Sequence, residues 1–318
     1  MKNLQLFIAL TFIIIGVFSC RQAENIDQDK PTIALVLKTL NNPFFIDMVK
    51  GAEDASEKLD VNLIVQAAER EVDVEKQMQI IENLIERKVD VICVAPSGSK
   101  EIVPAIVKAN KANIPVIAVD TRVDEKVLNE SNGKVIGFIG SDNVDGGRIA
   151  GKFIAEKLNG KGKVAVLEGI PGHETGDARL KGFYESVNQY TEIEIVASQT
   201  ANWERDQGYN VFQNMYQANP DINALFACND MMALGAVEAI SIAGKTGDII
   251  VVGFDAIEDS RIAIKNGTMH GSIAQHPREM GKLAVEYAVK LVNGENIDYE
   301  IPVKIELITK EKLSPVKD

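Results

Sequence analysis

Residues 31–59 read PTIALVLKTLNNPFFIDMVKGAEDASEKL, and this stretch decides the class of fold. Thr32–Lys38 is a short, largely apolar run, which predicts a buried strand. After a turn, Pro43–Leu59 places its apolar residues at helical spacing, and proline is favoured in the first turn of a helix. A buried strand followed at once by an amphipathic helix is the repeating unit of an α/β protein.

The same unit recurs along the rest of the chain. Helical patterns, such as those over Val74–Ile85 and Ser99–Asn110, separate the apolar runs. Because strands that are apolar throughout need helices on both faces, we expect parallel sheets. The number of strands favours two similar doubly wound α/β domains, with a single barrel of strand–helix units as the alternative. The predicted strands are 32–38, 61–66, 90–95, 115–120, 134–140, 163–169, 192–198, 224–228, 249–254 and 270–274.

Three features refine this pattern. Val123–Gly133 reads as a loop between the two sets of strands. A long helical pattern over Pro277–Val292 and a last strand over Ile301–Ile308 follow the second set. They predict that the chain crosses back, so that neither domain is a single segment.

The start of the chain reads as a lipoprotein signal peptide over residues 1–19. Lys2 provides the charged start, Leu4–Phe18 is almost wholly apolar, and Ser19 precedes Cys20. The apolar run suits a signal peptide and is shorter than the roughly 20 residues of a spanning helix. We expect Cys20 to carry the lipid and polar residues 20–30 to form a flexible tether. Plain secretion or an uncleaved anchor are the alternatives, and each puts the folded part outside the cytoplasmic membrane.

Composition excludes some classes of partner. The chain is 46% hydrophobic and 25% charged, as expected of a globular protein, and its net charge of −12 argues against nucleic acid. Cys93 and Cys228 each lie in an apolar run of a different predicted sheet, so we expect buried free thiols and no disulfide.

Ligands of parallel α/β sheets bind beyond the carboxyl ends of the strands. At these ends the chain has many side chains that form several hydrogen bonds, but no pair of histidines, no pair of cysteines and no serine in a nucleophile elbow. The pattern predicts a binding protein with no metal and no cofactor. The polar strand ends are Lys38, Ser97, Asp120, 141–143, Glu168, Asn229, Asp230, Asp255 and Gln275.

The stretch Lys38–Phe45 closely resembles the opening of the ribose- and allose-binding proteins, the periplasmic receptors of sugar ABC importers. The likeness runs from about Pro31 to the C-terminus, and further motifs recur in order. They are Ala118–Asp120, Gly140–Asn143, Glu168–Gly172, Asp177–Arg179, Asn202–Arg205, Cys228–Asp230, Val252–Asp255 and Ile273–Gln275.

The resemblance implies a periplasmic binding protein fold of type I, with two lobes that three crossover strands join. Residues 31–141 plus 276–304 would form the N-terminal lobe, and 142–275 plus 305–318 the C-terminal lobe. Asp120 would accept two sugar hydroxyls, Arg179 would donate from the opposite lobe, and Phe45 and Trp203 would face the two sides of the sugar ring. The implied ligand-binding set is Lys38, Asn42, Phe44, Phe45, Asp120, Arg179, Trp203, Asn229, Asp255 and Gln275.

The resemblance leaves the exact sugar open. Lys38 and Ala95 match the allose-binding type, whereas Phe254 matches the ribose-binding type. A long lysine reaches an additional hydroxyl and a small alanine leaves room for it, so we expect a slight preference for a hexose over ribose.

The leading function is a monomeric, non-enzymatic receptor that delivers a neutral monosaccharide to an ABC permease. A receptor that presents the sugar to a chemoreceptor or sensor kinase is the second reading. A carbohydrate-active enzyme of the envelope is the third, and it would need a catalytic pair of carboxylates that the strand ends do not supply. The expected location is the periplasm or the exterior of the cell envelope, with a lipid anchor in the membrane.

Overall fold

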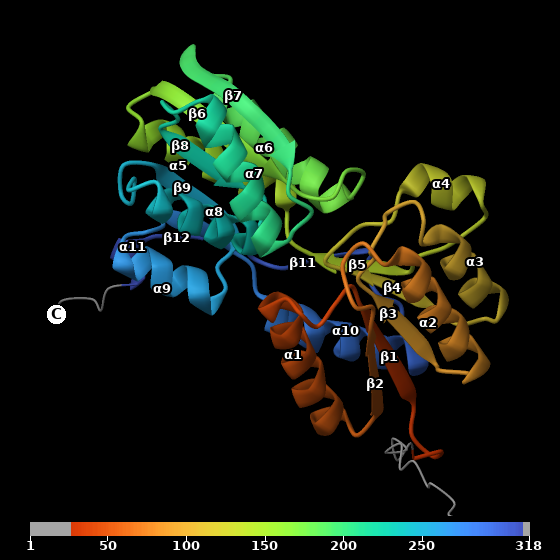
Figure 1. Ribbon diagram of the computed structural model, residues 1–318. Coiled ribbons are helices and arrows are strands. Elements are labelled where there is room, and N and C mark those ends of the chain that lie inside the picture. The colour runs from red at the N-terminus through yellow and green to blue at the C-terminus, as the bar shows by residue number, and fades with distance from the viewer. Residues whose placement is uncertain (1–26, 314–318) are drawn as a thin grey trace, which may run out of the picture.

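The computed structural model describes residues 27–313, so the signal peptide, Cys20 and most of the tether lie outside the described residues. The described chain forms two α/β lobes, each built around a six-stranded sheet. Figure 1 shows the lobes side by side, with the chain passing between them near its centre.

The N-terminal lobe contains a parallel sheet in the order β11-β5-β4-β3-β1-β2. Its strands are β1 Thr32–Leu37, β2 Asn62–Ala67, β3 Val91–Val94, β4 Val116–Val119, β5 Gly137–Gly140 and β11 Glu300–Pro302. The C-terminal lobe repeats this plan in the order β12-β10-β9-β8-β6-β7, with only β12 antiparallel to its neighbour. Its strands are β6 Lys161–Glu168, β7 Glu192–Thr200, β8 Ala224–Ala227, β9 Ile250–Asp255, β10 Gly271–Ala274 and β12 Glu306–Ile308.

Helices cover both faces of each sheet. Those of the N-terminal lobe are α1 Pro43–Leu59, α2 Val74–Glu86, α3 Val103–Lys111, α4 Glu125–Glu130 and α10 Pro277–Val292. Those of the C-terminal lobe are α5 Asn143–Lys157, α6 Glu174–Val187, α7 Arg205–Ala218, α8 Asp230–Ile242, α9 Glu258–Asn266 and α11 Lys310–Leu313.

Strand β1 shows why its sequence is apolar at every position. Successive side chains of a strand point to opposite faces of the sheet. Ile33 and Leu35 pack with residues of α1 and α10, whereas Ala34 and Val36 pack with residues of α2 and α3. All four side chains are fully buried. The expectation of two doubly wound parallel-sheet domains is therefore confirmed, and the single barrel is excluded.

Three predicted elements differ most from the structure. The last strand, expected over Ile301–Ile308, is divided at residues 303–305 into β11 and β12, which pair with different sheets. Helix α3 begins at Val103 rather than Ser99, because residues 97–102 form turns first. The expected loop Val123–Gly133 contains the short helix α4, whose start is capped by the Asp124 carboxylate accepting from the Val127 amide.

The chain crosses between the lobes three times, after β5, after β10 and between β11 and β12. Cys93 in β3 and Cys228 after β8 are free and buried, as predicted. Among residues 27–313, no helix is long and apolar enough to cross a membrane.

Candidate functional site

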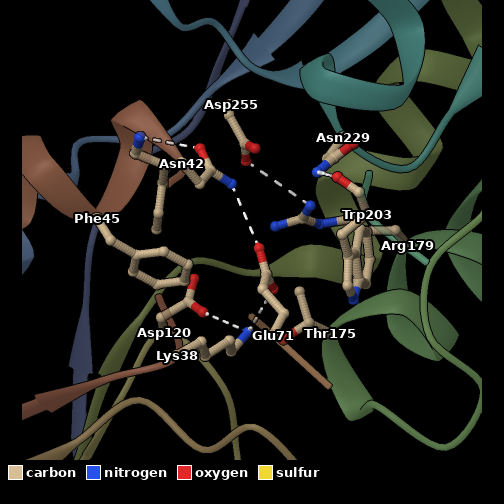
Figure 2. Close-up of a pocket in the computed structure, with 11 residues that line it drawn as sticks. Lys38, Asn42, Phe45, Glu71, Asp120, Thr175, Arg179, Trp203, Asn229 and Asp255 are labelled. Carbon is tan, nitrogen blue, oxygen red and sulfur yellow. Dashed lines mark hydrogen bonds and ion pairs between the residues drawn. The ribbon is translucent and has the colours of Figure 1, made fainter. Parts of the chain in front are cut away.

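The polar strand ends of both lobes meet at one cavity between them (Figure 2). The N-terminal lobe contributes six lining residues and the C-terminal lobe five. They are Lys38, Asn42, Phe44, Phe45, Glu71 and Asp120, and then Thr175, Arg179, Trp203, Asn229 and Asp255.

A buried ion pair forms the end of the cavity in the N-terminal lobe. Lys38 follows β1 and Asp120 follows β4, and both residues are 3% exposed. The Lys38 ammonium donates to Asp120 Oδ2 at 3.1 Å, and the Thr121 hydroxyl donates to the same oxygen at 3.0 Å. Hydrogen bonds between charged groups in a low-dielectric site are the stronger kind, so this pair holds both side chains in place.

The start of helix α1 supplies the amide and the aromatic rings of the same wall. The Asn42 side chain caps the helix by accepting from the Phe44 amide at 3.0 Å. Phe44 and Phe45 both line the cavity and meet edge to face, with ring centroids 5.2 Å apart. The Lys38 ammonium lies 5.6 Å from the centre of the Phe45 ring. One side of the cavity is thus apolar and aromatic.

Arg179 of helix α6 enters the cavity from the opposite lobe. Its Nε donates to Asn143 Oδ1 at 2.9 Å, and its Nη1 donates to the Cys228 carbonyl at 2.6 Å. The guanidinium stacks on the Phe254 ring, 3.8 Å from the ring centre, and lies 3.7 Å from Asp255. These contacts occupy two of the five guanidinium donors, and the others remain for a bound molecule.

Asp255 is the last residue of strand β9, and the side chain of Gln275 holds its carboxyl group in place. The Gln275 amide donates to Asp255 Oδ1 at 2.8 Å. Burial raises the pKa of Asp255 well above its usual value, and the nearby Arg179 opposes this shift. Gln275 itself lies behind Asp255 and is not among the lining residues.

Trp203 precedes helix α7, and hydrogen bonds to its backbone and to its indole ring hold it in place. The Asn229 amide donates to the Trp203 carbonyl at 3.1 Å, and the Trp203 indole N–H donates to His173 Nδ1 at 3.3 Å. Burial lowers the pKa of His173 to about 3, so the imidazole is neutral and its Nδ1 accepts. The indole is therefore held rigidly as a flat wall of the cavity.

The structure brings all the predicted site residues except Gln275 to the cavity wall. Sequence reasoning missed Glu71 and Thr175. Glu71 lies in the charged run EREVD at 69–73, where no periodicity distinguishes an inward side chain. Thr175 lies in the first turn of α6, and no motif in the sequence singled it out. Within residues 27–313, no cluster of His, Cys, Asp and Glu is arranged to hold a metal ion.

A family model described as a periplasmic binding protein domain matches residues 33–296. The chain belongs to the periplasmic binding protein family. The family implies a periplasmic location, which agrees with the expectation that the folded part lies outside the cytoplasmic membrane.

Among its relatives, the ribose import binding protein of Escherichia coli K12 is 39% identical over 89% of this chain and 92% of that protein. The D-allose-binding periplasmic protein of the same organism is 37% identical over 85% of this chain and 86% of that protein.

Solved structures of ABC transporter solute-binding proteins share the fold. One from Actinobacillus succinogenes, with bound D-allose, superposes with a TM-score of 0.85 at 43% identity and covers 89% of this chain and 99% of its own. One from Agrobacterium vitis, bound to α-D-tagatopyranose, has a TM-score of 0.85 at 31% identity, over 90% of this chain and 97% of its own.

Proposed function

We propose that this protein is an extracytoplasmic receptor that binds a neutral monosaccharide in the cavity between its lobes and delivers it to an ABC permease. The main evidence for this proposal is the kind of side chains that form the cavity wall. Aromatic side chains lie on its sides, and charged groups that form several hydrogen bonds come from both lobes. A sugar ring has apolar C–H faces and hydroxyls around its edge, and this arrangement of groups is complementary to it.

The charges of the wall favour an uncharged ligand. Two cationic groups, Lys38 and Arg179, face the carboxyl groups of Glu71, Asp120 and Asp255. A sugar acid or sugar phosphate would bring further negative charge to this acidic surface. The relatives named for ribose and allose, and the solved structures with bound allose and tagatose, support the same class of ligand.

Calorimetry with a panel of sugars tests the proposal. The panel contains ribose, allose, fructose, psicose, other pentoses and hexoses, and inositols. At least one neutral monosaccharide should bind, and Asp120→Ala and Arg179→Ala should each weaken it about 100-fold or more, about 2.8 kcal/mol. Each change leaves opposing groups of the site unpaired. Asp221→Ala, which removes an exposed ion pair with Lys163, is the control and should bind normally. Wild-type affinity in both site variants would contradict the proposal.

We propose further that the lobes, 31–141 plus 276–304 and 142–275 plus 305–318, close on the sugar and present a joint surface to the permease. The three crossings between the lobes support this division. No catalysis is proposed, because Asp120 and Asp255 are each already engaged by a cation or an amide. Sugar recovered unchanged after prolonged incubation, as measured by NMR, is the expected result, and any turnover would contradict it.

The lipid anchor at Cys20 is also proposed, on the leader sequence alone. The wild-type protein should incorporate labelled fatty acid and sediment with membranes, and Cys20→Ala should do neither. The control is Cys93→Ala, which changes a buried thiol inside the fold and should be labelled like the wild type. A Cys20→Ala protein that is still labelled would contradict the anchor.

A further inference from the structure

Glu71 enters the cavity from a loop rather than from a strand end or a helix. It lies between β2 and α2, and it is 6% exposed while its neighbours Glu69, Arg70 and Val72 are exposed. A glutamate that is buried among exposed neighbours is uncommon, because removing a carboxyl group from water costs free energy.

The loop is built to turn this side chain inward. The Thr39 hydroxyl and the Asn41 side-chain amide both donate to the Glu69 backbone carbonyl, at 2.9 and 2.8 Å. These hydrogen bonds tie the loop to the segment just before α1. The Arg70 backbone amide, just before Glu71, donates to Asp73 Oδ2, two residues after it, at 3.0 Å. The backbone is thus fixed on both sides of Glu71, which directs its carboxyl group between Asn42 and Lys38 (Figure 2).

The protein itself provides the Glu71 carboxyl group with only weak partners. The Asn42 amide nitrogen lies 3.4 Å from Oε1, and the Lys38 ammonium lies 3.9 Å from Oε2, which is too far for a hydrogen bond. The ammonium is engaged at 3.1 Å by Asp120 instead. Burial outweighs the attraction of Lys38 and raises the pKa of Glu71. A buried carboxyl group with such loose contacts is poised to bond a group that enters the cavity.

We propose that Glu71 contacts the sugar directly and, with Lys38, selects a ligand that has one more hydroxyl at this end than ribose has. The ligand class is a neutral hexose or cyclitol. This inference rests on the proposed function and deepens it. Ala95, which the resemblance associated with the same preference, is fully buried and not among the lining residues, so the selection is assigned to Lys38 and Glu71.

The test compares Glu71→Ala and Glu71→Gln with the wild type by calorimetry, using D-ribose, D-allose, D-fructose, D-psicose and myo-inositol. Glu71→Ala should weaken the tightest hexose or inositol at least tenfold, about 1.4 kcal/mol, and change ribose less than twofold. Glu71→Gln keeps the shape of the side chain and one acceptor, so it should lose less. Glu69→Gln, in the same loop but exposed, is the matched control and should bind like the wild type.

Thermal unfolding without sugar separates a contact role from a structural one. Because the carboxyl group is buried with weak partners, both Glu71 variants should melt at or above the temperature of the wild type. A variant that melts much lower, or that weakens ribose and hexoses equally, would overturn the inference, as would wild-type affinity for every sugar. Ribose binding tenfold more tightly than every other sugar would also overturn it. A wild-type protein that binds no monosaccharide would instead refute the proposed function.

Discussion

Three residues of the cavity wall have backbone conformations that L-amino acids rarely adopt. The φ angles of Asp120, Trp203 and Asp255 are 63°, 68° and 112°. Each such position costs roughly 1–3 kcal/mol and persists where the surrounding structure enforces it, commonly at binding sites. Here the unusual backbone turns each side chain from the end of its strand or loop toward the cavity. At the scale of the residue, the site is thus held by backbone geometry as well as by hydrogen bonds.

Because His173 is buried in its neutral form, we expect the free energy of unfolding to depend on pH in a specific way. Its pKa is about 3 in the folded protein and about 6.5 when exposed, so the unfolded chain binds the proton first. The stability that His173 contributes is therefore present above pH 6.5 and is lost as the pH falls toward 3. In chemical denaturation, the stability advantage of the wild type over His173→Gln should shrink between pH 6.5 and 4, by up to about 1.4 kcal/mol per pH unit. Parallel pH profiles would contradict this.

Glycines at the crossing of α5 and α6 decide where Arg179 lies. A Cβ atom added at Gly147 would lie 2.0 Å from the Arg179 carbonyl oxygen, and one at Gly182 would lie 1.8 Å from the Val144 carbonyl oxygen. The two helix backbones therefore touch, and only glycine permits this approach. At the scale of the element, the packing of two helices sets the position of a guanidinium in the cavity.

Gly147→Ala should consequently affect both stability and binding. Overpacking of this kind costs roughly 1–3 kcal/mol, and the displacement of α6 should move Arg179 away from its partners. We expect a lower melting temperature and weaker sugar binding in calorimetry. Lys152→Ala, on the exposed side of α5, is the control for the change in helix propensity and should do neither. A destabilised Gly147→Ala protein with normal affinity would show that the packing of α5 against α6 does not determine the position of Arg179 in the cavity.

Direct contacts between the lobes add to the three chain crossings. The Thr121 and Thr175 hydroxyls are 2.8 Å apart, and the Glu174 amide donates to Ser99 Oγ at 3.2 Å. In both contacts a residue of the first turn of α6 meets the N-terminal lobe. At the scale of the whole molecule, these hydrogen bonds hold the lobes together around the cavity.

Ser99→Ala should weaken sugar binding without touching the cavity wall. The change removes one hydrogen bond between the lobes, about 1 kcal/mol, so the closed arrangement becomes less populated and the apparent Kd should rise about fivefold. Small-angle X-ray scattering of the sugar-free variant should give a larger radius of gyration. Ser198→Ala is the control, because its hydroxyl bonds within the C-terminal lobe. Unchanged affinity and radius in Ser99→Ala would rule out this role.

The order of residues along the chain was sufficient for the class of fold and for most of the cavity wall. Apolar runs such as Thr32–Leu37 form buried strands because both faces of the sheet are covered, and this requirement is visible in any single strand. Lys38, Asp120 and Asp255 were predictable because they lie at strand ends, and the carboxyl ends of parallel strands share one edge of a sheet. The motif resemblance added Arg179 and Trp203.

The tertiary structure alone decided what depends on contacts between distant segments. Glu71 reaches the cavity because Thr39 and Asn41 tie its loop to the start of α1, a contact that leaves no periodic trace in the sequence. The last predicted strand is divided because its two halves find edges of different sheets. Gln275 lies behind Asp255 because strands β9 and β10 are neighbours in register. Local pattern determines which residues form an element, whereas packing between elements determines which of them meet.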